Sequence, residues 1–364
     1  MSSLERTLSL LLLMALGFFF RNRISSKDQR EGVRIIILSL ALPATIFIAL
    51  VKVNFTASLI IIPVLALVFN LVMFALISRL PLQSMFHIPD QQYRTLVLLL
   101  PSLAPGLSCF PFILEYSGED KVALAALADL GNKIFVLIIA YVIAMRWYFR
   151  LNSRGEGSGK VNIKDVVRSL INEPVNTVIA VAILMLAFGL NYTSLPGFLR
   201  AGIDKVSLLM TPLVLLFIGM SIRLTWQQVK TIFSFLLFRS GIAFLMSGLL
   251  LWLLPPQDLA TALLIVVFPQ SATSFWPYSH MAAVSGLENK QGEQRVRTFD
   301  LDFAMNVLGC SMPFSVVMIL FIYTTGDLFT RPVAVTGTAG LLILLALLPG
   351  LLPIFRTVKL AHGK

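Results

Sequence analysis

Residues 101–118 read PSLAPGLSCFPFILEYSG, and residues 269–286 read PQSATSFWPYSHMAAVSG. Each stretch starts with a proline inside a long apolar segment, and each ends in a Ser-Gly pair at the same distance from that proline. An interior proline removes a helix hydrogen bond and clashes with the preceding turn, at a cost of about 3 kcal/mol or more. The matched spacing therefore favours an internal repeat that contains two broken helices. The alternative is that both stretches are ordinary proline kinks.

The composition around these stretches predicts an all-α polytopic membrane protein. Apolar residues make up 57% of the 364 residues and charged residues 13%, whereas soluble proteins have roughly 25% charged residues. Backbone groups in lipid must be paired within the segment, so the spans are expected to be helices. The apolar segments are at 7–20, 33–51, 57–78, 95–116, 122–145, 175–192, 206–222, 231–254, 258–284, 299–323 and 335–355.

The same sequence excludes several other classes. Both cysteines lie in apolar segments and the three histidines are far apart, which argues against a disulfide scaffold, a zinc site or an HExxH enzyme. The net charge of +11 is not concentrated in a basic helix, so the expected partner is the lipid bilayer and not nucleic acid. No Walker motif is present, so ATP is not expected to be a direct energy source. No cofactor or metal is expected.

The basic residues predict the orientation of the chain. With the N-terminus outside, most of the 29 lysines and arginines fall in loops on the cytoplasmic side. We therefore expect an external N-terminus and a cytoplasmic C-terminus.

A polar linker divides the chain into two halves of similar pattern. We expect a first repeat at 1–148 (helices 1–5), a cytoplasmic linker at 149–173, a second repeat at 174–325 (helices 6–10), and an extra C-terminal helix and tail at 326–364. Since each half has an odd number of spans, the two repeats are expected to be inverted. Broken helices at matching places of inverted repeats indicate a binding site of a transporter near the bilayer midplane. The N-termini of the half-helices favour an anion there.

Substrate contacts are predicted along the two broken helices, 4 and 9. The candidates are the prolines, the glycine and the small polar residues around the breaks: Ser102, Pro105, Gly106, Ser108, Pro111, Pro269, Gln270, Ser271, Thr273, Ser274 and Pro277.

Ionisable residues inside the predicted spans are candidates for ion coupling. Asp129 and Lys133 are four residues apart on helix 5, so they share a face, and Asn132 lies beside them. These residues could hold a cation or a proton, or form a static ion pair. Asp302 and Asn306 on helix 10 could mirror them. The candidate coupling ions are a proton and sodium.

Two further ionisable residues leave alternatives open. His280 follows a proline of helix 9 and could relay a proton, or could be a packing residue. Arg239 in helix 8 needs an anionic partner, for which Glu115 is a candidate, or a path to water; it could instead attract an anionic substrate.

Several segments together resemble the auxin efflux carrier family of permeases, which belongs to the superfamily of bile acid, arsenite and riboflavin transporters. The segments are Leu10 to Arg21, Leu38 to Phe47 with Pro43, Tyr116 to Lys133, Thr211 to Ile222, and Phe268 to Ser271. The resemblance implies a panel domain of helices 1, 2, 6 and 7, and a mobile core of helices 3, 4, 5, 8, 9 and 10. It also implies that helices 4 and 9 cross at the substrate, that a small organic anion moves by alternating access, and that the protein is a homodimer.

The sequence thus favours a secondary transporter for a small organic anion, and not an enzyme. A sodium-coupled symporter of the bile acid type is the alternative within the same class. A membrane receptor or sensor that binds its ligand without moving it is the alternative from another class.

Overall fold

The computed structural model describes residues 3–24, 26–52, 57–86, 88–152, 174–221, 226–256, 258–290 and 297–361. All regular elements in these residues are helices. Seven helical runs are long and apolar enough to cross a membrane, and three shorter apolar helices accompany them. The protein is therefore an all-helical, multi-pass membrane protein, which confirms the predicted fold class.

The first half contains the first broken helix. Its elements are α1 (Ser3–Phe20), α2 (Lys27–Ile36), the π-helical turn η1 (Ile37–Ala41), α3 (Leu42–Lys52), η2 (Ala57–Ile60), α4 (Ile61–Arg79), α5 (Leu82–Phe86), α6 (Asp90–Leu99), α7 (Pro105–Ser108), α8 (Phe110–Ser117), α9 (Glu119–Lys133), the π-helical turn η3 (Ile134–Ile139) and α10 (Ala140–Asn152).

The second half contains the second broken helix and the extra C-terminal helix. Its elements are α12 (Pro174–Ala187), η4 (Tyr192–Ser194), α13 (Gly197–Ser207), α14 (Met210–Ser221), α15 (Trp226–Leu253), α16 (Leu259–Val267), η5 (Phe268–Gln270), α17 (Phe275–Lys290), α18 (Leu301–Thr325), η6 (Gly326–Thr330) and α19 (Pro332–Ala361).

Each predicted apolar segment coincides with a helix in the described part of the chain. Two boundaries differ. The fifth span continues through Asn152, so helix extends into the first residues of the predicted linker, and residues 153–173 of that linker lie outside the described residues. The seventh span begins at Gly197, because α13 and α14 form one apolar run.

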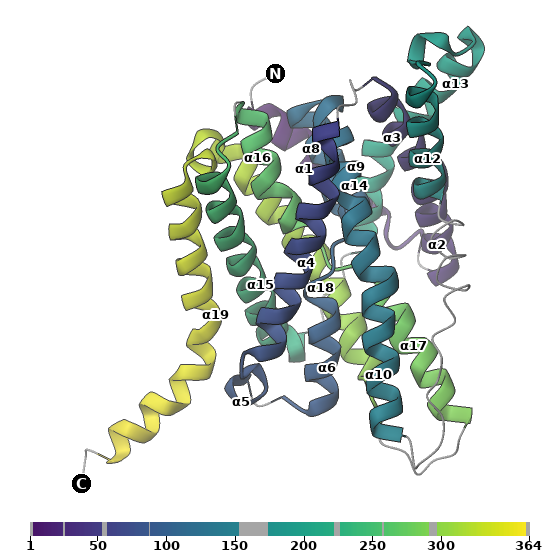
Figure 1. Ribbon diagram of the computed structural model, residues 1–364. Coiled ribbons are helices and arrows are strands. Elements are labelled where there is room, and N and C mark those ends of the chain that lie inside the picture. The colour runs from purple at the N-terminus through teal and green to yellow at the C-terminus, as the bar shows by residue number, and fades with distance from the viewer. Residues whose placement is uncertain are drawn as a thin grey trace.

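The helices pair across the two halves in a reciprocal way. α1 packs along α14, and α12 packs along α3, so helix 1 meets helix 7 and helix 6 meets helix 2. In Figure 1, α19 lies at the edge of the bundle, where it packs along α15. The extra helix therefore covers helix 8 and does not lie among helices 1, 2, 6 and 7.

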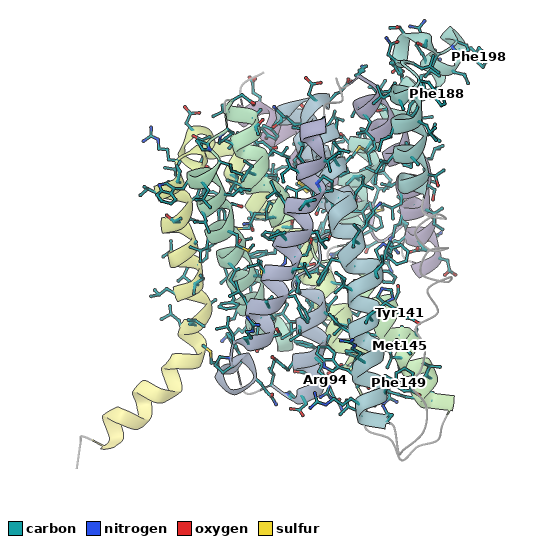
Figure 2. The ribbon with its side chains drawn as sticks, in the orientation of Figure 1. Arg94, Tyr141, Met145, Phe149, Phe188 and Phe198 are labelled. Carbon is teal, nitrogen blue, oxygen red and sulfur yellow. The ribbon has the colours of Figure 1, made fainter. Side chains whose placement is uncertain are left out.

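Side chains from different parts of the chain meet at each end of the bundle. At one end the Lys121 ammonium lies 3.1 Å from the Asp258 carboxylate. At the other end the Nε of Arg94 donates to the carbonyl of Thr298 at 2.8 Å, and Figure 2 shows Arg94 near the lower ends of α6 and α10. We propose that the Arg94 end is the cytoplasmic side.

Close glycine contacts hold α1 against α14. A Cβ atom on Gly219 would lie 2.0 Å from the carbonyl oxygen of Met14, and one on Gly17 would lie 2.2 Å from that of Leu216. Both obstacles are backbone atoms that cannot rotate away. Small residues thus let the two helices approach to backbone contact, as is usual between helices in a membrane.

We expect Gly219→Ala to destabilise the protein by about 1–3 kcal/mol, because the added methyl forces α1 and α14 apart. Gly337→Ala in α19 is the matched control, since a Cβ there meets no atom within 4 Å. Thermal unfolding in detergent measures both. An unchanged melting temperature for Gly219→Ala would contradict the close packing of these helices.

Candidate functional site

The two broken helices meet at their breaks. The first break, residues 100–104, separates α6 from α7, and the second, residues 271–274, separates η5 from α17. The backbone N–H of Ala104 donates to the carbonyl of Ala272 at 2.8 Å. The unwound segments of helices 4 and 9 are therefore in direct contact.

Two serines of the first break bind the backbone of the second. Ser102 Oγ accepts from the N–H of Ser274 at 2.9 Å, and Ser108 Oγ accepts from the N–H of Ala272 at 2.9 Å. Both hydroxyls also donate to carbonyls of their own helix. Backbone groups freed by the breaks are thereby satisfied without water, as a membrane interior requires. Ser102 and Ser108 are fully buried and join the two helices.

The polar residues of the second break bond to the helices behind it. Gln270 exchanges hydrogen bonds with Ser240 of α15, whose hydroxyl donates to its side-chain oxygen at 2.7 Å. Thr273 Oγ1 lies 2.8 Å from the hydroxyl of Ser311 in α18. Ser271 Oγ donates to the carbonyl of Phe268 in its own helix at 2.6 Å. This network fixes the second break against α15 and α18.

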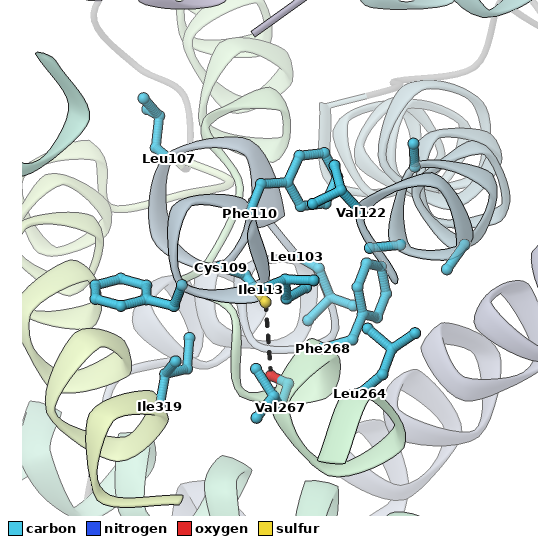
Figure 3. Packing of buried hydrophobic residues seen from close by; sticks show 14 of the residues in the cluster. Leu103, Leu107, Cys109, Phe110, Ile113, Val122, Leu264, Val267, Phe268 and Ile319 are labelled. Atoms are coloured by element: carbon cyan, nitrogen blue, oxygen red, sulfur yellow. Dashed lines mark hydrogen bonds between the residues drawn. The ribbon is translucent and has the colours of Figure 1, made fainter. Parts of the chain in front are cut away.

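Apolar packing closes the side of the crossing shown in Figure 3. There Cys109 points from the first broken helix toward the carbonyl of Val267 in the second, at 3.9 Å. Leu103, Phe110 and Ile319 belong to the same buried cluster. The five prolines of the two stretches are also buried: Pro101, Pro105, Pro111, Pro269 and Pro277.

A cavity of about 790 Å³ lies beside the crossing. This volume is within the range of roughly 300–1,000 Å³ that is typical of ligand sites. Four predicted binding residues line it: Pro105, Gly106, Thr273 and Ser274. Apolar side chains from α2, η1, α3, α14, α17 and α18 form much of the rest, including Ile35, Leu38, Leu42, Phe217, Phe275, Trp276 and Met312.

Asp129, Asn132 and Lys133 line the same cavity and are buried together. The Lys133 ammonium lies 3.6 Å from the Asp129 carboxylate, and Asn132 donates to that carboxylate at 2.8 Å. Asn132 also exchanges two hydrogen bonds with the backbone of Leu103, at 2.9 and 3.1 Å. The predicted cluster on helix 5 is thus tied directly to the first break.

Two groups at the site were missed by the sequence analysis. Asn70 of α4 is fully buried and donates to the carbonyl of Pro101 at 2.6 Å. Arg34 of α2 lines the cavity, pairs with Glu31 at 3.0 Å and lies over the Phe275 ring at 4.6 Å. Asn70 could have been found from the sequence, because it is a polar residue inside a predicted span. Arg34 could not, because the sequence shows it only as one of several basic residues near a loop.

Arg239 of α15 binds backbone carbonyls. Its guanidinium donates to the carbonyls of Leu100, Ser102 and Ser271 at 2.7, 3.1 and 2.8 Å. It is 3% exposed and is not among the residues that line the cavity. In this position Arg239 does not form the suggested ion pair with Glu115. It also does not attract a substrate directly, because it does not line the cavity.

The remaining coupling candidates lie outside the cavity. Asp302 stands in the first turn of α18 with an exposed side chain, and Asn306 is half-buried one turn later. The Nε2 of His280 lies 2.9 Å from the carbonyl of Val136, and its ring meets the edge of Tyr141. The structure therefore joins the helix 5 residues to the crossing but not these three.

π-helical turns shape two walls of the cavity. Leu38 and Ser39 of η1 line one wall, and Val136 of η3 lines another. Pro43, the second residue after η1, has no N–H to donate, so the helix widens where that hydrogen bond is missing. Such turns are frequent at functional sites.

These features define a multi-pass membrane protein with a cavity beside the crossing of two broken helices. No protein-family profile matches the chain. The chain is similar to a protein of Methanocaldococcus jannaschii described as an uncharacterized transporter, with 23% identity over 263 residues, which cover 69% of this chain and 80% of that protein.

Proposed function

We propose that the protein is a secondary transporter that moves a small organic anion by alternating access. The observation that carries this proposal is the cavity beside the two breaks, which is lined by Lys133, Arg34 and the first turn of α17. Helix N-termini carry a partial positive charge that favours anions. The archaeal relative, itself described as a transporter, supports transport over sensing or catalysis.

The lining suggests what kind of anion fits. Phe217, Phe275 and Trp276 offer apolar area for the body of a ligand, and the cationic groups are confined to Lys133 and Arg34 among the lining residues. A ligand with one anionic group and an apolar body would satisfy both parts of the cavity. Small, fully hydrated anions would leave the apolar walls unused.

The position of the cavity supports movement between two domains. One wall comes from α2, η1, α3 and α14, which belong to helices 2 and 7, and the opposite wall comes from the breaks, α9 and α18. These are the proposed panel and the proposed core. Displacement of the core along the panel would expose the cavity first to one side of the membrane and then to the other. We further propose a homodimer as the assembled form.

Asp129 and Lys133 are proposed to couple transport to a proton. The Asp129 carboxylate neutralises the Lys133 ammonium at 3.6 Å. A proton on Asp129 would leave Lys133 as an unbalanced cation, which favours an anionic ligand. Proton and anion would then bind together and leave together.

The Asp129→Asn variant is expected to keep anion uptake but to lose its response to a proton gradient, because asparagine imitates a permanently protonated carboxyl. Wild-type flux should change by up to about tenfold per pH unit of imposed gradient. Asp327→Asn in η6 is the control, since Asp327 is exposed and does not line the cavity. A gradient response in Asp129→Asn equal to that of wild type would rule out Asp129 as the coupling residue.

The proposed function is tested by flux into proteoliposomes. Labelled dicarboxylates, an indole carboxylate and bicarbonate are offered under imposed sodium, proton or potential gradients, with protein-free liposomes as the background. We expect saturable uptake of at least one organic anion. Binding of an anion that crosses under none of the gradients would contradict transport and favour a sensor.

A further inference from the structure

Arg239 stands where the carboxyl ends of two half-helices converge. Leu100 and Ser102 follow the last turn of α6, and Ser271 follows η5 at the end of α16. The three carbonyl oxygens lie 2.7, 3.1 and 2.8 Å from nitrogens of one guanidinium. A single buried cation thus contacts both breaks from the side of α15.

Two helix C-termini that lie close together are stabilised by a positive charge between them. The last carbonyls of a helix have no intrahelical donor and carry a partial negative charge. In a membrane interior water does not replace the missing donors. Unwound carbonyls and half-helix carboxyl ends are the groups that coordinate sodium or protons in transporters with broken helices. The crossing therefore offers an arrangement that suits a monovalent cation.

We propose that the guanidinium of Arg239 is a built-in cation that fills this position, so that the protein needs no sodium ion at the crossing. The structural part of the proposal concerns only the occupancy of the position. Its consequence for coupling, sodium-independent transport, rests on the proposed function.

The surroundings of Arg239 agree with a permanent occupant. Among the residues that the structure describes, no carboxylate forms an ion pair with it, so its charge is directed to the carbonyls. A guanidinium stays protonated in proteins and cannot leave its chain. The next residue, Ser240, holds Gln270 of the second break, which fixes α15 against that break. Asp129, which is connected through Asn132 to Leu103 of the first break, is already paired with Lys133.

The test is the thermal stability of purified protein in sodium chloride against choline chloride, which requires no knowledge of the substrate. The melting temperature of wild type should be the same in sodium chloride and in choline chloride. The melting temperature of Arg239→Lys should likewise not differ between the two salts. Arg239→Ala should melt at least about 5 °C lower in choline, because three buried carbonyls lose their donor. Sodium or methylguanidinium chloride, but not choline or urea, should recover part of that loss.

Ser247→Ala is the matched control, because Ser247 is a buried residue two turns further along α15 that bonds to the carbonyl of Ile265, away from the breaks. Its melting temperature should not depend on the cation. Stabilisation of wild type by sodium would overturn the proposal, as would an Arg239→Ala protein that no cation stabilises. If Arg239→Ala does not fold, the comparison of wild type with Arg239→Lys decides, since sodium dependence in either contradicts a built-in cation. These outcomes are independent of whether any anion is transported.

Discussion

Replacing Lys133 by methionine is expected to reduce anion uptake by at least about a hundredfold. The substitution leaves the Asp129 carboxylate buried without its partner at 3.6 Å, and breaking a buried ion pair from one side typically costs about 3–5 kcal/mol. It also removes one of the two cations that line the cavity. Both effects act on the site where we place the anion, and uptake into proteoliposomes measures the result.

The double variant Asp129→Asn/Lys133→Met separates folding from transport. It removes both charges, so it should recover most of the melting temperature lost by Lys133→Met while uptake stays low. Recovery of uptake together with stability would mean that the pair only holds helix 5 in place. That is the static ion pair, the alternative that the sequence left open.

The second large effect is expected from Gly106→Leu, which should abolish both anion binding and uptake while the protein remains folded. Gly106 lines the cavity between the first break and α3. A Cβ atom there would already lie 2.7 Å from the Cδ2 of Leu42, so a leucine side chain would fill space that the ligand needs. It would also hinder movement of the proposed core along the proposed panel. Binding by calorimetry and uptake by flux measure the two losses.

Gly286→Leu is the matched control for that experiment. Gly286 lies on α17, the helix that follows the second break, and a Cβ there meets no atom within 4 Å. Uptake should remain close to that of wild type. Equal uptake by Gly106→Leu and Gly286→Leu would place the ligand somewhere other than this cavity.

Local signals account for what the sequence predicted well. Hydropathy located each span. Unpaired backbone groups are costly in lipid, so a long apolar stretch forms a helix, in which these groups are paired. The prolines of residues 101–118 and 269–286 located both breaks, since the missing N–H and the ring clash act within one turn. The cluster of Asp129, Asn132 and Lys133 followed from helical spacing alone.

Partners from distant parts of the chain were beyond the reach of these signals. Ser102 and Ser108 read as substrate ligands, yet each hydroxyl bonds to the backbone of the other broken helix. Arg239 suggested a search for a carboxylate, whereas its partners are carbonyls that only the breaks make available. Which atoms face one another across a crossing depends on tertiary packing, which the local sequence does not encode.

The apparent mirror of the helix 5 cluster shows the same limit. Asp302 and Asn306 repeat an i,i+4 spacing, but Asp302 lies in the first turn of α18, two residues after the capping residue Asp300. Its exposed position follows from where the helix begins. The sequence similarity between the two halves therefore predicted the positions of the breaks, which depend on proline, better than the depth of a charged side chain.

The most direct test of alternating access is the accessibility of one cavity position from each side of the membrane. Gly309→Cys is suitable, because Gly309 lines the cavity and a Cβ there meets no atom within 4 Å. The native thiols, Cys109 and Cys310, are both buried and would be replaced by alanine. In vesicles of known orientation, a membrane-impermeant thiol reagent should label residue 309 from either side, and a transported anion should slow that labelling. Labelling from one side only, whatever anion or gradient is present, would contradict transport through this cavity.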